Sequence, residues 1–194
     1  GRKAGINPVR PSGTDNAKLL GKNNATVTNV SGNSAKKLNC LFVNARSIIS
    51  NFKLEELKLY VVEHKIDVIG IAESWLTENI SDSEIAIENY TVYRKDRSQI
   101  KGNRGGGVLL YVNNKIVSCS CENLNQFKCE AIWCSLRLTG SHEIIIGAMY
   151  KSPNATEDVI REMFSCIQLA SNKQLILMGD FNYPGINWEL LESN

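Results

Sequence analysis

The sequence predicts a mixed α/β domain built in layers. Short apolar runs of strand length alternate with two segments whose apolar residues recur at helical spacing, and a meander of further short runs interrupts the alternation. With 194 residues, 43% of them hydrophobic, the chain is long enough for one domain with a sizeable core and short for two. We therefore expect one α/β domain rather than a helix bundle or a sandwich of strands alone.

Residues 1–37 differ in composition from the rest. They are rich in Gly, Asn, Ser, Thr and Lys and show no apolar repeat typical of a helix or strand. We expect a disordered basic arm or linker there, followed by one domain over residues 38–194. Lys and Arg outnumber Asp and Glu in the arm, whereas the domain has a small excess of negative charge. Net charge alone therefore does not indicate nucleic-acid binding, and such a function must be argued from motifs.

The first part of the domain is predicted to be strand, helix, strand. Leu38–Val43 has the apolar run of a buried strand, and Ile66–Ala72 has that of a strand buried on both faces. Between them, Leu54–His64 has helical periodicity. The apolar face of this helix is expected to hold Leu54, Leu57, Val61 and Val62.

The middle of the domain is predicted to be a sheet-rich meander. Its expected strands are Tyr90–Tyr93, Gly107–Val112, Ala131–Leu138 and Glu143–Tyr150. A second helix is predicted at Thr156–Ala170, because Asn154 and Glu157 have capping-box spacing and an apolar stripe that includes Phe164 follows. A last strand is expected at Leu175–Met178.

Polar residues able to do chemistry stand where the apolar runs end. Asn44, Glu73, Tyr150 and Asp180 each lie at or just after the end of such a run. In α/β sheets the carboxyl ends of the strands line the ligand crevice, so residues distant in sequence can meet there. Any one of these residues could simply mark where a strand leaves the core. Four together favour a functional site.

The residue types fit hydrolysis of a phosphate ester. Mg²⁺ prefers oxygen ligands and usually takes one or two protein carboxylates, and Glu73 is the first candidate. Asp180 could orient and deprotonate an attacking water. The neutral groups of Asn44, Tyr150 and Asn182 could bind phosphoryl oxygens without adding repulsive charge. Acyl transfer fits poorly, because no serine lies in a nucleophile elbow.

The motifs resemble a known family. They are Asn44-Ala-Arg-Ser47, Glu73-Ser-Trp-Leu76, Arg104-Gly-Gly-Gly-Val-Leu-Leu-Tyr-Val112, Tyr150-Lys-Ser-Pro153 and Gly179-Asp-Phe-Asn-Tyr-Pro-Gly-Ile-Asn-Trp188. In this order they resemble the endonuclease/exonuclease/phosphatase domain, and within it the apurinic-type endonuclease of jockey-like non-LTR (LINE-type) retrotransposons. The resemblance implies a four-layer α/β sandwich, in which two packed mixed sheets are flanked by helices, and a Mg²⁺-dependent phosphodiesterase, with Mn²⁺ able to replace Mg²⁺.

The resemblance also implies a role for each site residue. Glu73 would be the metal ligand, Asn44 would contact the metal shell or the phosphate, and Tyr150 would stabilise the pentacovalent phosphorane. Asp180 would activate the water, and Asn182 would orient Asp180 and bind the oxyanion. Nicking of double-stranded target DNA would leave a 3′-hydroxyl that primes reverse transcription. A reverse transcriptase domain is therefore expected in the same polyprotein.

Two departures from the family pattern raise alternatives. Arg46 stands where repair-type relatives have Asp, and the family's late Ser-Asp-His motif has no counterpart. We therefore expect the domain to be incomplete at its C-terminus. The alternatives are a catalytically impaired retroelement remnant that at most binds DNA, and a repair-type apurinic endonuclease or small-phosphate phosphatase of the same superfamily.

Several cations are candidates for contact with DNA phosphates. The expected contacts are Arg46, Arg94, Lys95, Arg97, Arg104 and Lys151. A solvated loop would have the same composition around residues 94–104. No stretch approaches the about 18–20 apolar residues of a membrane span, and no signal peptide is evident, so we expect an intracellular protein of the nucleus or cytoplasm.

Overall fold

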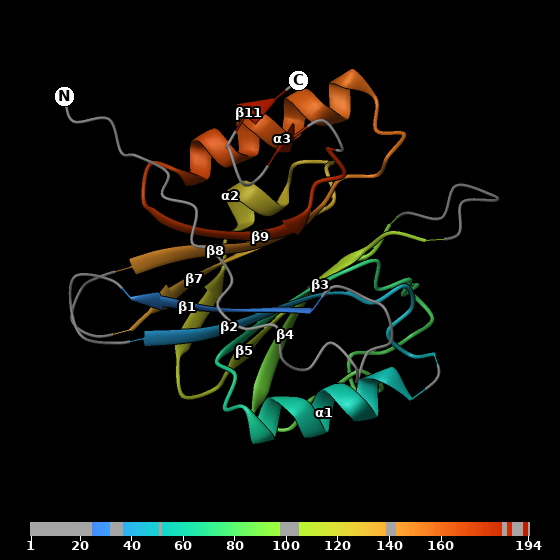
Figure 1. Ribbon diagram of the computed structural model, residues 1–194, viewed down its shortest axis with the longest axis vertical. Coiled ribbons are helices and arrows are strands. Elements are labelled where there is room, and N and C mark those ends of the chain that lie inside the picture. Colours follow the sequence, from blue (N-terminus) through green and yellow to red (C-terminus); the bar gives the residue numbers. More distant parts are fainter. Residues whose placement is uncertain are drawn as a thin grey trace.

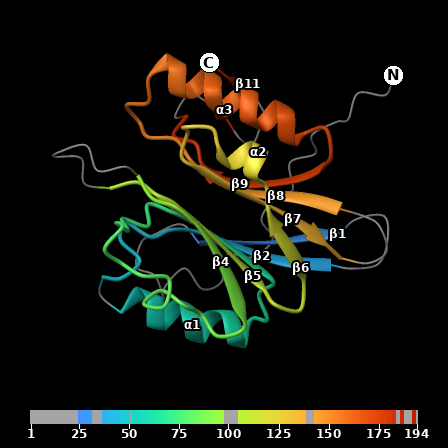
Figure 2. The ribbon, with the colours of Figure 1, turned by 180° about the vertical axis from the view of Figure 1, so that it is seen from behind.

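Two mixed β-sheets pack face to face, and helices cover their outer faces (Figures 1 and 2). The computed structural model describes residues 25–31, 37–50, 52–97, 105–138, 143–183, 186–187 and 192–193. Helix α1 (Lys53–Glu63) lies outside one sheet, and α3 (Glu157–Ala170) with the short α2 (Glu122–Asn125) lies outside the other. The four-layer α/β architecture expected from the sequence is confirmed.

The first sheet has five strands in the order β1-β2-β3-β5-β4. Their bounds are β1 Ala25–Ser31, β2 Lys37–Asn44, β3 Val68–Ala72, β4 Tyr90–Lys95 and β5 Val108–Asn113. Strands β2 and β3 are parallel and are connected through α1, whereas the other pairs are antiparallel. The carboxyl ends of β2 and β3 therefore lie at the same edge of this sheet.

The second sheet has four strands in the order β6-β7-β8-β9. Their bounds are β6 Val117–Ser120, β7 Ala131–Arg137, β8 Glu143–Tyr150 and β9 Gln174–Asp180. Strands β8 and β9 are parallel and are connected through α3. Two short strands, β10 (Ile186–Asn187) and β11 (Glu192–Ser193), pair only with each other among the described residues.

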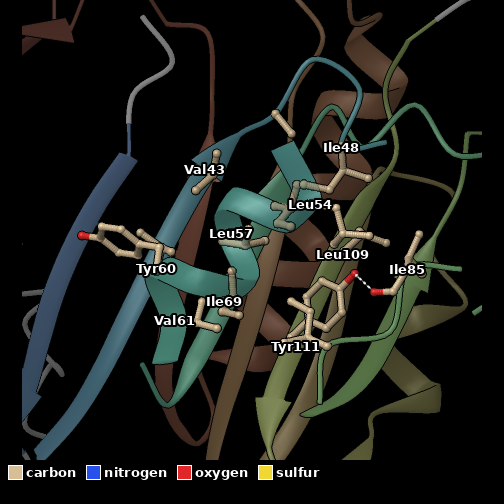
Figure 3. Packing of buried hydrophobic residues seen from close by; sticks show 14 of the residues in the cluster. Val43, Ile48, Leu54, Leu57, Tyr60, Val61, Ile69, Ile85, Leu109 and Tyr111 are labelled. Carbon is tan, nitrogen blue, oxygen red and sulfur yellow. Dashed lines mark hydrogen bonds between the residues drawn. The ribbon is translucent and has the colours of Figure 1, made fainter. Parts of the chain in front are cut away.

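Three apolar clusters fill the spaces between the four layers. The cluster between α1 and the first sheet includes Leu57, Ile69 and Tyr111, whose hydroxyl donates a hydrogen bond of 2.8 Å to the carbonyl of Ile85 (Figure 3). A second cluster lies between the sheets and a third lies under α3. Strands β3 and β5 are buried on both faces, which explains their unbroken apolar runs.

The structure differs from the sequence expectations in three places. Strand β1 lies inside the segment expected to be an arm and pairs with β2 from Lys37 to Val43. The β-branched composition of Ala25–Ser31 favours a strand despite the missing apolar alternation. Thr156, not Asn154, caps α3, and its hydroxyl accepts the Val159 N–H. Val62 and Phe164, both expected in apolar stripes, are exposed because smaller arcs of α1 and α3 face the sheets.

No helix in the described parts of the chain is long and apolar enough to cross a membrane.

Packing of Trp133 against Gly147 yields a first prediction. The two residues are directly opposite on β7 and β8, and a Cβ added at Gly147 would lie 2.3 Å from two carbons of the buried Trp133 ring. Gly147→Ala should therefore lower the free energy of unfolding by about 1–3 kcal/mol, measured by urea denaturation. Gly70→Ala is the matched control, because its nearest neighbour is the flexible end of Met178, at 3.0 Å. Equal losses in the two variants would contradict this packing.

Candidate active site

The parallel strand pairs of the two sheets end at one common edge. Asn44 ends β2 beside Ala72 of β3, and Tyr150 ends β8 beside Asp180 of β9. Glu73 follows β3 directly. Because the sheets are stacked, four residues from distant parts of the sequence meet there: Asn44, Glu73, Tyr150 and Asp180.

The side-chain amide of Asn44 joins the two sheets at this edge. Its Nδ2 donates a hydrogen bond of 2.9 Å to Glu73 Oε1 and another of 2.7 Å to Asp180 Oδ2. Both amide hydrogens are thereby directed at carboxylates. A neutral donor placed between two negative groups offsets their mutual repulsion.

The oxygen atoms at this edge fit a divalent cation. Asn44 Oδ1 is buried and has no hydrogen-bond partner among the described residues, although buried acceptors are normally satisfied. It belongs to the same amide whose Nδ2 contacts the carboxylates of Glu73 and Asp180, and these carboxylates are hard oxygen donors of the kind Mg²⁺ prefers. The described residues contain no group of three His, Cys, Asp or Glu able to hold a metal. A Mg²⁺ site needs no such group, because the ion usually keeps several waters beside one or two carboxylates.

Strained backbone fixes the position of Glu73. Its φ is 52°, in the left-handed region that residues with a side chain rarely adopt, and Trp75 has φ 56°. The Glu73 carbonyl accepts the Ser47 N–H at 2.9 Å, and the Trp75 indole N–H donates to Glu73 Oε2 at 3.3 Å. Arg46 and Ser47 also have positive φ, so strain is concentrated around the end of β2 and β3, as at many functional sites.

The backbone of the triple glycine forms hydrogen bonds with the residues that follow Glu73. Gly105, Gly106 and Gly107 all have positive φ. The Ser74 N–H donates to the Gly107 carbonyl at 3.1 Å, and the Trp75 N–H donates to the Gly106 carbonyl at 2.9 Å. These two hydrogen bonds hold the residues that follow Glu73 against the start of β5.

Tyr150 presents a neutral phenol at this edge. Its side chain is buried, and this burial, with the nearby negative charge of Glu73, raises the pKa of the Tyr150 hydroxyl to about 12. The Arg97 guanidinium carbon lies 5.8 Å from the centroid of the ring and has the opposite, weaker effect. Tyr150 is therefore a hydrogen-bond donor throughout the neutral pH range.

Lys151 and Asn182 hold each other in place. Asn182 Nδ2 donates to the Lys151 carbonyl at 2.8 Å, and Lys151 Nζ donates to the Asn182 carbonyl at 3.3 Å. Lys151 is only 5% exposed, and its ammonium lies 4.4 Å from the centroid of the Tyr183 ring. The sequence predicts that the Lys151 ammonium contacts DNA. In the structure it instead contacts the loop that follows Asp180, inside the protein.

The other residues expected to contact DNA differ in exposure and in their bonds within the protein. Arg46 is exposed beside the site. Arg94 bonds to two carboxylates and two carbonyls, Lys95 bonds to two carbonyls, and Arg97 pairs with Glu130. Arg104 lies outside the described residues. Apart from Asp96, which lies two residues after Arg94, the internal partners of Arg94, Lys95 and Arg97 come from other segments, and no motif marks them.

Trp75 and Glu130 are site residues that the motifs do not identify by role. The position of Trp75 two residues after Glu73 is a visible signal, but its indole bond to the carboxylate depends on the left-handed backbone of both residues. Glu130 has no local signal, because each of its partners comes from another segment.

Comparisons with known proteins agree with this architecture. The family described as "Endonuclease/Exonuclease/phosphatase family" matches residues 29–193. The endonuclease domain of TRAS1, a telomere-specific non-LTR retrotransposon, is 17% identical with a TM-score of 0.53, over 74% of this chain and 58% of that one. No curated protein matches the chain.

Two DNA-bound structures are also similar. D. rerio TDP2, complexed with single-strand DNA product, is 15% identical with a TM-score of 0.51, over 76% of this chain and 62% of that one. The 3′ phosphatase NExo from Neisseria, bound to a product DNA hairpin, is 13% identical with a TM-score of 0.50, over 78% and 59%. At these identities the similarity shows the fold, and the chain spans 58% to 62% of these three structures' chains.

The bridge made by Asn44 yields a prediction about cations. Asn44→Asp replaces the donor between Glu73 and Asp180 with a third negative group, so in chelator it should cost on the order of 1–3 kcal/mol of stability. Mg²⁺ or Mn²⁺ should restore part of this loss, because a ligand that binds only the folded state stabilises it. Thermal unfolding with and without metal measures both effects. The exposed Asn123→Asp is the control for the added charge and keeps the site, so it should also respond to metal, and the absence of a metal response in both variants would contradict a cation site here.

The raised pKa of Tyr150 yields a prediction about ionisation. Folded-state protonation stabilises the protein below the ordinary pKa of 10.0, and this contribution is lost as the pH rises toward about 12. The difference in ultraviolet absorption between wild type and Tyr150→Phe should therefore show no tyrosinate at pH 10. A tyrosinate signal with a midpoint near 10 would contradict the buried, negatively charged surroundings of the phenol.

Proposed function

The chain belongs to the endonuclease/exonuclease/phosphatase family, whose members are hydrolases that act on phosphodiester bonds, and on that premise we propose that it is a metal-dependent endonuclease that nicks double-stranded DNA. The observation that supports this proposal most is the bridge from Asn44 to Glu73 and Asp180. It joins two carboxylates of different sheets through an amide whose oxygen has no partner among the described residues, and such oxygen donors suit a cation that would in turn attract a phosphodiester.

Each side chain at this edge has a chemical task in the proposed reaction. Glu73 and Asn44 Oδ1 would hold Mg²⁺ or Mn²⁺, which would supply positive charge for the phosphodiester. Asp180 accepts a proton from the attacking water. Tyr150 donates a hydrogen bond to a phosphoryl oxygen as negative charge grows there, and its raised pKa keeps that proton in place.

Asn182 completes the proposed reaction centre. Its side-chain amide donates to the Lys151 carbonyl, and its backbone is left-handed two residues after Asp180. We propose that the Asn182 amide orients the Asp180 carboxylate and binds a phosphoryl oxygen when the substrate is present. Hydrolysis in line would leave a 5′-phosphate and a free 3′-hydroxyl.

We infer that the nick serves a retrotransposon of the jockey-like non-LTR branch. The sequence motifs and the fold similarity to the TRAS1 endonuclease domain support this role. The free 3′-hydroxyl would prime reverse transcription, and a reverse transcriptase domain in the same polyprotein would extend it. Arg46, exposed beside the site, is the foremost candidate for contact with the DNA backbone.

The proposal predicts the effect of removing either carboxylate. Asp180→Asn and Glu73→Gln should each slow nicking of supercoiled plasmid by about 10²–10⁴-fold in Mg²⁺, while circular dichroism shows an unchanged fold. Chelator should abolish nicking by the wild type. Asp158→Asn, which alters an exposed carboxylate on α3, should leave nicking unchanged.

Three outcomes would contradict parts of this proposal. Nicking retained by both site variants would remove Glu73 and Asp180 from the mechanism. A folded wild type that binds DNA without cutting it would support the impaired remnant. Cleavage of an abasic oligonucleotide or release of phosphate from small esters, with intact duplex left uncut, would support the repair-type or phosphatase alternative.

A further inference from the structure

Glu130 lies just before β7 and contacts three segments of the chain. Its backbone carbonyl accepts the Tyr150 N–H at 2.8 Å. Its carboxylate accepts the Gly107 N–H through Oε2 at 2.7 Å and the Arg97 guanidinium through Oε1, with Nε at 2.8 Å. The side chains of Glu130 and Arg97 are 19% and 22% exposed, so this ion pair is mostly shielded from water.

The backbone of the triple glycine packs directly on this ion pair. A Cβ added at Gly106 would lie 2.3 Å from the Arg97 guanidinium carbon and 2.4 Å from Glu130 Oε2. Only a glycine leaves room for the pair at this distance. This internal contact explains the glycine at position 106.

Hydrogen bonds connect the pair to both halves of the reaction centre. Toward the first sheet, the Gly106 and Gly107 carbonyls accept the N–H groups of Trp75 and Ser74, and the Trp75 indole donates to Glu73. Toward the second sheet, Glu130 binds the Tyr150 backbone, and Arg97 lies over the Tyr150 ring. Glu130 thus holds the loop that supports Glu73 through its carboxylate, and the strand end that carries Tyr150 through its backbone carbonyl.

We propose that Glu130 and Arg97 are positioning residues that fix Tyr150 relative to Glu73, and that Arg97 does not serve as a DNA contact. This inference rests on the proposed function, because Tyr150 and Glu73 are the groups it aligns. Two N–H groups of the planar Arg97 guanidinium, on Nε and on one terminal nitrogen, donate to Glu130 Oε1, and this gives orientation as well as attraction, which a single point charge cannot supply. Loss of either partner leaves the other charge shielded from water and unpaired.

The test separates positioning from DNA contact by steady-state nicking kinetics. Arg97→Lys keeps the positive charge and loses the fork, and Glu130→Gln keeps the shape and loses the ion pair. Both should lower kcat by about tenfold or more with the KM for DNA nearly unchanged, and the double variant should be no worse than the more damaged single one, because the two residues act as a unit. Arg137→Gln, at an exposed cation of β7, is the control for a change of charge.

A DNA contact would give a different pattern. If Arg97 contacts a phosphate, its removal should raise the KM for DNA and lower the salt dependence of binding by about one charge. Arg97→Lys should then largely keep binding, and Glu130→Gln should remain active. That result would overturn the proposal. Thermal unfolding of each variant shows whether it is folded, and Gly106→Ala, which crowds the pair without altering either charge, should reproduce the kcat loss.

A measurement without substrate separates failure of this inference from failure of the proposed function. In nuclear magnetic resonance spectra, the Tyr150 ring and Gly107 amide signals should shift in Arg97→Lys and Glu130→Gln and stay unchanged in Arg137→Gln. Unchanged signals in the first two variants would overturn the positioning role, whether or not the wild type nicks DNA. If the signals shift in these variants but the wild type does not nick DNA, the positioning role would stand and the proposed endonuclease activity would be wrong.

Discussion

The hydrogen bonds of the Asn44 amide to Glu73 and Asp180 are the interaction on which the site depends. They join groups 136 residues apart and connect the two sheets at the edge where their parallel strands end. The arrangement requires the register of both parallel strand pairs. Asn44 of β2 must lie opposite Ala72 of β3, and Tyr150 of β8 must lie opposite Asp180 of β9. It also requires the apolar cluster between the sheets, which sets how the two edges face each other.

The same β-α-β unit appears twice and supplies both edges. In each unit a strand, a helix and a parallel strand bury an apolar layer under the helix, with α1 in the first unit and α3 in the second. The burial of these layers allows strained turns to persist at the strand ends, where Glu73 and Asn182 adopt left-handed backbone. Rigid sheets therefore position polar side chains that lie on irregular segments.

The sequence allows prediction of the layers and of which polar residues end their strands, since apolar runs and helical spacing are local signals. The sequence does not allow prediction of side-chain partners that only the tertiary fold brings together. Arg94, Lys95 and Arg97 form a basic run in the sequence, but each bonds to groups that the fold brings from elsewhere, such as Asp82 and Glu130. Lys151 is buried for the same reason, because Tyr183 and the Asn182 carbonyl come from the loop after β9.

Location of a bound cation tests the central claim most directly. Mn²⁺ accepts the same oxygen ligands as Mg²⁺ and gives an anomalous X-ray signal, so crystals grown with Mn²⁺ show where the ion lies. We expect an anomalous peak among the side-chain oxygens of Asn44, Glu73 and Asp180. A peak elsewhere, or none while the Asn44 amide still bonds to both carboxylates, would contradict the assignment of this edge as the metal-dependent site.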